Sequence, residues 1–203
     1  MERGVEGGRT GGMTGRRHGF EYQSCYCEEN VYLMGKELSD QWPGQSFHVL
    51  FISNPSRSVL ISNQRAKENE IVCWDYHVVL LHLHHDLSSI YDLDTRLPFP
   101  CPASQYLTHS FPKGVSPELT PLFRVLPLHS YLSYFSSDRS HMISQSGEYL
   151  SPPPSWPPIN SPLAESPNQI DQFISMNPLH LSPISQVLNL DQMNSFCSLN
   201  NDA

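Results

Sequence analysis

The segment IVCWDYHVVLLHLH, Ile71–His84, is rich in β-branched and aromatic residues, which favour strands. Side chains of a strand alternate between two faces, and both alternating sets are largely apolar here. A strand that is apolar on both faces is covered on both sides, so we expect a central strand of a sheet. His77 lies in its middle, where a buried imidazole needs a partner for its ring N–H.

A helix is expected before this strand, and it begins near the short motif SCYCEEN, Ser24–Asn30. Four residues recur at helical spacing and define its inward face: Cys27, Val31, Met34 and Leu38. Ser24 is a suitable N-cap, and two glutamates after Cys27 suit the positive end of the helix dipole. The WPG at Trp42–Gly44 is expected to end the helix.

Further strands are expected in SFHVLFIS (Ser46–Ser53), VLIS (Val59–Ser62) and SSIYDLDT (Ser88–Thr95). The last of these follows Ile71–His84 closely enough to form an antiparallel hairpin with it. RLPFPCP breaks the sheet, LFRVLPLHSYLSYF fits strand or helix, and the proline-rich stretch up to Pro167 predicts no regular element. A helix followed by several strands predicts an α+β domain.

Composition narrows the class of protein. The 203 residues suffice for one medium domain, and the net charge of −8 without a Lys/Arg-rich run argues against a nucleic-acid partner. No window approaches 18 consecutive apolar residues, so we expect no membrane span, and no secretory signal is expected at the N-terminus. Residues 1–20, rich in Gly and Arg, predict a disordered tail. Five dispersed cysteines, an odd number, indicate free thiols in a reducing cytoplasm.

Cys27 is the candidate nucleophile. A thiol at a helix N-terminus near an imidazole has a lowered pKa, and helical phase turns Cys27 toward the sheet. Cys25 lacks that orientation. A plain buried cysteine is the alternative reading of Cys27, because free cysteines are often simply packed in the core.

Asp92 is the candidate partner of His77. If the hairpin is centred near residues 84–85, the two face each other, and a carboxylate there would orient the imidazole and support its protonated form. A core histidine with a structural partner is the alternative. The same register sets Asp75 opposite Asp94, so a cation is expected there, either Arg96 or the ammonium of a substrate.

A metal site is the competing reading of these residues. However, Cys25-x-Cys27 lacks the spacing of a zinc knuckle, and no second cysteine pair follows, so we expect no metal. The histidines of HLHH, residues 82–85, are read as the end of a strand and a turn. SPPPSWPP is read as a surface loop, with a polyproline ligand as the alternative.

Six blocks occur in this order: SCYCEENVY, FISN, WDYHVVLLH, IYDLDTRLPFPC, SYLSYFSSDRSHM and FISM. Together they closely resemble the protein N-terminal glutamine amidohydrolase family, from Ser24 to Met176. The resemblance implies a monomeric papain-like or transglutaminase-like α+β fold without a cofactor. It implies hydrolysis of the side-chain amide of an N-terminal glutamine in the N-degron pathway, in the cytoplasm and also the nucleus. The catalytic residues of the family fall on Cys27, His77 and Asp92.

Recognition of a chain terminus requires acceptors for a free α-ammonium, and the candidates are Asp75, Asp94, Glu28 and Glu29. Two departures from the family stand out: Ser62 replaces a usual tryptophan, and the sequence after about residue 177 matches poorly. We therefore expect a single amidohydrolase domain over 21–203 whose closing element is displaced or shortened. Two alternative functions stay open: a thiol protease or transglutaminase-like acyl transferase, and a catalytically impaired module that binds N-termini.

Overall fold

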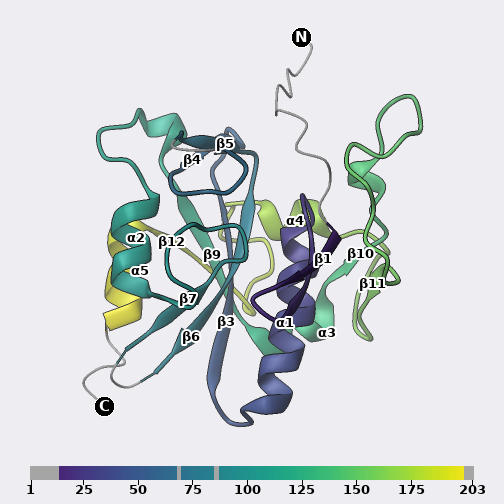
Figure 1. The fold of residues 1–203 in the computed structure, drawn as a ribbon, viewed down its shortest axis with the longest axis horizontal. Helices are drawn as coiled ribbons and strands as arrows, with labels where there is room; N and C mark the ends of the chain where they lie inside the picture. Colours follow the sequence, from purple (N-terminus) through teal and green to yellow (C-terminus); the bar gives the residue numbers. More distant parts are fainter. Residues whose placement is uncertain (1–13, 68–69, 85–86, 199–203) are drawn as a thin grey trace.

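The computed structural model describes residues 14–67, 70–84 and 87–198. Its centre is a six-stranded sheet in the order β12-β9-β3-β6-β7-β8, in which every neighbouring pair is antiparallel (Figure 1). The strands are β3 (Ser46–Ser53), β6 (His77–Leu83), β7 (Ser89–Tyr91), β8 (Cys101–Pro102), β9 (Leu122–Pro127) and β12 (Gln186–Asn189). With helices packed on this sheet, the α+β class expected from the sequence is confirmed.

Helices cover both faces of the sheet, as Figure 1 shows. On one face lie α1 (Cys27–Gln41), α3 (Leu128–Tyr134) and α4 (Ile170–Ile174); on the other lie α2 (Ala103–Ser110) and α5 (Leu190–Ser198). Strand β6 serves both cores, because Val78 and Leu80 point to the first and Val79 and Leu81 to the second. The prediction of a covered central strand is therefore confirmed.

Helix α1 has the predicted inward face: Val31, Met34 and Leu38 are at most 2% exposed, and Cys27 packs against the same core. Burying each such apolar side chain contributes about 1.5–3 kcal/mol. The predicted cap is wrong, since Tyr26 occupies the N-cap position and no side chain caps the helix. The helix ends at Gln41, as the WPG motif predicted.

The segment Ile71–His84 is not one strand. Val72–Trp74 forms β5, which pairs with β4 (Val59–Ile61) in a separate small sheet, and the chain re-enters the main sheet at His77. The expected hairpin exists, but Leu81 pairs with Ile90, two positions away from the expected register. Because β7 ends at Tyr91, Asp92 lies beyond its end, and the predicted opposition of Asp75 and Asp94 is wrong.

Regular elements form near both ends of the described chain. Within the predicted tail, residues 1–13 lie outside the described residues, but β1 (Thr14–Arg17) pairs with β2 (Phe20–Gln23). At the other end, the segment after residue 177 supplies β12 and α5, which pack on the sheet. The guanidinium of buried Arg124 donates to the carbonyls of Ser175, Asn177 and His180, which fixes this segment to β9.

The remaining segments show why local patterns were ambiguous. The segment that fitted either strand or helix forms both, β9 and then α3. The short pieces are β8, which extends the sheet where a break was expected, β10 (Ser136–Ser137) paired with β11 (Ile159–Asn160), and the 3₁₀ turns η1 (Pro117–Leu119) and η2 (Ser140–Met142). Among the described residues, no helix is long and apolar enough to cross a membrane.

Candidate active site

The centre of the site is a buried pair, His77 at the first position of β6 and Asp92 just after β7. His77 Nε2 lies 2.9 Å from Asp92 Oδ1, and the two side chains are 2% and 1% exposed. The same oxygen accepts the Asp94 N–H at 2.8 Å. The other, Oδ2, accepts Gln64 Nε2 at 3.0 Å and the Tyr106 hydroxyl at 2.8 Å. Four donors therefore hold the Asp92 carboxylate in one orientation.

These contacts reinforce the charges of the pair. Burial by itself lowers the pKa of His77, but the adjacent Asp92 carboxylate outweighs it, and the pKa of His77 is raised. Burial by itself raises the pKa of Asp92, but His77, Gln64 and the Asp94 N–H outweigh it, and that pKa is lowered. Trp74 stacks on the imidazole with ring centroids 5.8 Å apart. The ring is thereby fixed with Nε2 toward Asp92.

Cys27 lies against the start of the same strand. The Val78 backbone N–H, one residue after His77, hydrogen-bonds to the Cys27 sulfur. The turn that delivers Cys27 is held by Asn30, whose side chain accepts the Gln23 N–H at 2.9 Å and donates to the Gln23 carbonyl at 2.8 Å. Cys25, with φ of 67°, is exposed at the bend of this turn. Cys27 is thus directed inward and Cys25 outward.

The Cys27 thiol is held in its neutral form in the free protein. Burial raises the pKa of Cys27, and the nearby carboxylates Glu28 and Asp94 raise it further. The bond from Val78 acts in the opposite direction but does not outweigh them. Three elements bring these groups together: the start of α1, the start of β6 and the turn after β7.

The adjacent glutamates have different partners, although both are fully buried. Glu28 Oε2 accepts the Tyr76 hydroxyl at 3.1 Å and lies 3.6 Å from the Cys27 sulfur. Its Oε1 has no hydrogen-bond partner within the described chain, although His141 Nε2 lies 3.5 Å away. Glu29 instead forms a bidentate pair with Arg139, both bonds at 2.8 Å, and accepts the Trp156 indole N–H at 2.7 Å.

The two other acidic candidates also differ. Asp94 accepts Arg17 at 3.0 Å and the Tyr22 hydroxyl at 2.5 Å, so the expected cation is Arg17. Arg96 donates to the Gln64 carbonyl instead. The exposed Asp75 accepts the N–H of the next residue at 2.9 Å and has no ion-pair partner among the residues described.

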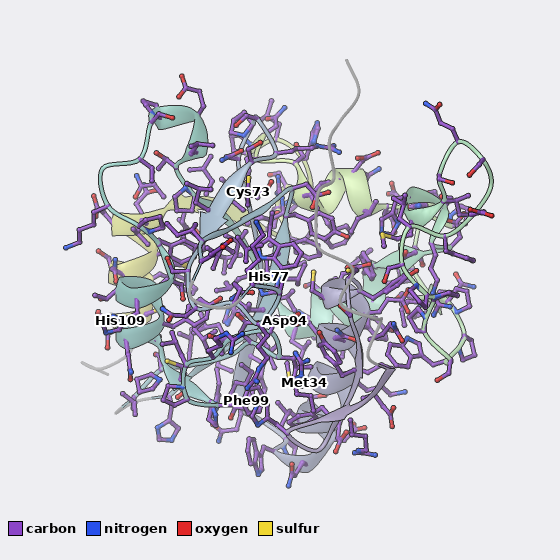
Figure 2. The ribbon with its side chains drawn as sticks, turned by 45° about the horizontal axis from the view of Figure 1, so that its top comes forward. Met34, Cys73, His77, Asp94, Phe99 and His109 are labelled. Carbon is purple, nitrogen blue, oxygen red and sulfur yellow. The ribbon has the colours of Figure 1, made fainter. Side chains whose placement is uncertain are left out.

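One group of donor atoms in the described part of the chain is compact enough to share a metal ion, namely His77, Asp92 and Asp94, within 4.8 Å of one another. Figure 2 shows His77 and Asp94 near the centre of the molecule. The hydrogen bonds described above already engage Nε2 of the histidine and both carboxylates. A hydrogen-bonded acid–base network therefore accounts for this cluster.

Four contributors were missed in the sequence: Gln64, Trp74, Tyr106 and His141. Gln64 and Tyr106 reach Asp92 from outside the β6–β7 hairpin, so no local pattern connects them. Trp74 was read as part of a continuous strand. His141 lies within SYLSYFSSDRSHM, one of the blocks that carried the resemblance, and that block was the available signal.

The sequence profile of the N-terminal glutamine amidase family matches residues 22–197. The chain belongs to this family. The matched range includes Cys27, His77 and Asp92 and extends into α5, in the segment that looked divergent.

Curated relatives agree with this assignment. The chain is 44% identical over 163 residues to the protein N-terminal glutamine amidohydrolase of Bos taurus, an alignment covering 77% of this chain and 78% of the relative. It is 42% identical to the protein of the same name from Homo sapiens, with the same coverage of both chains. The Danio rerio protein of that name is 42% identical over 77% of this chain and 80% of its own.

Proposed function

We propose that this protein hydrolyses the side-chain amide of an N-terminal glutamine, giving an N-terminal glutamate and ammonia. The observation that carries the proposal is the buried His77–Asp92 pair beside Cys27, in a chain whose relatives are named for this activity. The substrate class is therefore proteins or peptides with a free N-terminal glutamine.

The proposed reaction uses Cys27 as nucleophile, His77 as acid and base, and Asp92 to orient His77. Because His77 Nε2 is bonded to Asp92, Nδ1 is the nitrogen left to exchange a proton with the thiol. The thiolate attacks the carboxamide carbon, and backbone N–H groups at the start of α1 are candidates to stabilise the oxyanion. His77 then gives its proton to the departing ammonia, which leaves a γ-glutamyl thioester.

In the second half of the reaction, His77 takes a proton from water, which attacks the thioester carbon. The collapse of that intermediate releases glutamate, and the sulfur regains a proton from His77, so the cycle consumes one water and no cofactor. The order of a cysteine at a helix start, a histidine on a strand and an aspartate after the next strand also supports the proposal of a papain-like or transglutaminase-like fold.

The test is incubation with a Gln-Ala-initiated peptide, followed by ammonia release and mass spectrometry of the peptide. Wild type is expected to release one ammonia per deamidated peptide, and Cys27→Ala none. Cys25→Ala is the matched control, because Cys25 is exposed and directed outward. Cleavage of internal peptide bonds would instead indicate a protease, transfer of the γ-glutamyl group to an amine an acyl transferase, and binding without ammonia release a non-catalytic module.

A further inference from the structure

Three carboxylates act on the Cys27 sulfur, whereas reactive thiols usually lie in electropositive surroundings. Glu28, Asp75 and Asp94 all act to raise its pKa, from α1, from the β5–β6 turn and from the turn after β7. A reaction that requires the thiolate is therefore opposed by the free site. The three carboxylates are not equivalent, because only Asp94 has an arginine partner, Arg17.

Glu28 is the acid closest to the nucleophile in the chain, and it is only half satisfied. Its side chain is fully buried, and Oε1 has no hydrogen-bond partner within the described part of the protein. A buried acceptor left without a bond costs about 1–3 kcal/mol, and more when it is charged. Such exceptions in a folded protein require an explanation, and a ligand that supplies the missing donor is one.

His141 is the group next to that oxygen. Its Nε2 forms a 3.5 Å ion pair with Glu28 Oε1 and lies 3.5 Å from the Tyr76 hydroxyl. Burial by itself lowers the pKa of His141, but the Glu28 carboxylate outweighs it and the pKa is raised. The ion pair does not meet hydrogen-bond geometry, and His141 Nδ1 is buried and unpartnered among the described atoms. His141 therefore lies beside Oε1 and leaves that oxygen without a hydrogen bond.

Asp75 is the second acid available to a ligand. It is exposed, and among the described residues its carboxylate accepts a hydrogen bond from the Tyr76 N–H. The hydroxyl of the same tyrosine donates to Glu28, so Tyr76 connects the two acids. The two carboxylates also interact electrostatically with each other and with His141. Tyr76 therefore bonds both an exposed acid and a buried acid, and the buried acid lies beside the Cys27 sulfur.

We propose that the α-ammonium of the substrate binds between Glu28 and Asp75, and that its charge there promotes deprotonation of Cys27. This inference rests on the proposed function, because it assigns the subsite for the N-terminus and a second role to the same charge. In this step the S–H bond of Cys27 breaks and an N–H bond forms on the His77 imidazole, and no other bond changes. An N-terminal glutamine would then be both recognised and used to activate the thiol.

The surrounding charges explain why an ammonium at this position is effective. The titratable groups that interact electrostatically with Cys27 are Glu28, Asp75, Tyr76, Asp94 and Tyr131. His77 and His141 both interact with Glu28. Burial raises the pKa of Cys27 most, and Glu28 has the largest effect among the neighbouring charges. A cation bound to Glu28 opposes that contribution directly. An acetylated N-terminus or an internal glutamine lacks the cation, so such a substrate loses rate as well as affinity.

The test follows thiolate formation at Cys27 by ultraviolet absorbance across pH, in a background in which the exposed Cys25 and Cys73 are replaced by serine. The probe is a norleucine-initiated dipeptide amide, which has an α-ammonium but no side-chain carboxamide to react. We expect it to lower the titration midpoint by about one pH unit, a tenfold change in the equilibrium. The acetylated dipeptide is expected to leave the midpoint unchanged.

Variants separate the two acids from the rest of the site. Glu28→Gln is expected to lower the midpoint without ligand, to remove most of the further shift, and to reduce kcat/KM for the Gln peptide at least tenfold. Asp75→Asn, at an exposed position, provides the same test if Glu28→Gln does not fold. Glu37→Gln, exposed on the same helix, is the matched control and should behave as wild type.

The inference is overturned if the acetylated peptide produces the same shift, if the free-amine peptide binds wild type without a shift, or if both acid variants respond like wild type. Ammonia release from a Gln peptide by the same preparation distinguishes this result from failure of the proposed function. Release without a midpoint shift refutes only the inference. A shift without release supports the ammonium subsite and refutes the amidase proposal.

Discussion

The Glu29–Arg139 pair permits a sharp test of which glutamate holds the fold together. In Glu29→Gln the side chain keeps its shape, so no cavity forms, but the buried arginine loses its counter-charge. The carboxylate accepts three bonds at 2.7–2.8 Å, two from Arg139 and one from Trp156. A glutamine offers one oxygen to these donors and turns its NH₂ group against the others. Breaking one side of a buried ion pair costs about 3–5 kcal/mol.

Urea unfolding followed by circular dichroism measures this loss. In a chain of this size, a loss of about 3–5 kcal/mol corresponds to a decrease in Tm of roughly 6–20 °C. The control is Asp171→Asn, which breaks an exposed ion pair: the Arg57 side chain is 47% exposed and the Asp171 side chain 79%. The loss of stability in this variant is expected to be below about 1 kcal/mol. If the two variants lose the same free energy, the structural role assigned to Glu29 is wrong.

Three further predictions concern the site. Cys27→Ser should abolish ammonia release from a Gln peptide and Cys25→Ser should retain most of it; equal losses would contradict the assignment of the nucleophile. The pKa of His77 is raised above 6.5, so its contribution to stability is complete below pH 6.5 and is lost as pH rises through the folded-state pKa. Urea unfolding of Asp92→Asn at several pH values should lack this decline. A pH profile of stability equal to that of wild type would refute the coupling of His77 to Asp92. Tyr106→Phe removes one bond to a charged acceptor and should cost about 1.5–3 kcal/mol in urea unfolding, with a cost near zero contradicting its role.

The helix and strand periods predicted the central architecture because each position was determined by burial. The spacing from Cys27 to Leu38 identified the inward face of α1, and Ser46–Ser53 forms β3 with the predicted bounds. The two-sided apolar pattern of β6 was equally informative. These signals are local in the chain, and a covered sheet requires them directly.

Register and turns were less predictable. The chain turns at Asp75 between β5 and β6, and composition did not reveal it because the strand-forming residues continue across the turn. The hairpin register differs by two positions, yet His77 still bonds Asp92 because a diagonal neighbour lies within reach of a side chain. The pairing of histidine with aspartate is thus confirmed for a geometry other than the expected one. Gln64 and Tyr106 come from distant segments and have no local signature.

Glu28 and Glu29 show how one turn of a helix separates stability from function. Successive residues on a helix point about 100° apart, so the first turns toward the sulfur and the strand start, and the second toward Arg139 and Trp156. Three donors engage both oxygens of the second carboxylate, which is already paired with an arginine. Glu28 keeps one oxygen without a hydrogen bond beside the nucleophile, and this destabilises the fold. Of the four acids first considered for the substrate ammonium, this contrast favours Glu28 together with the exposed Asp75. It disfavours Glu29 and the arginine-paired Asp94.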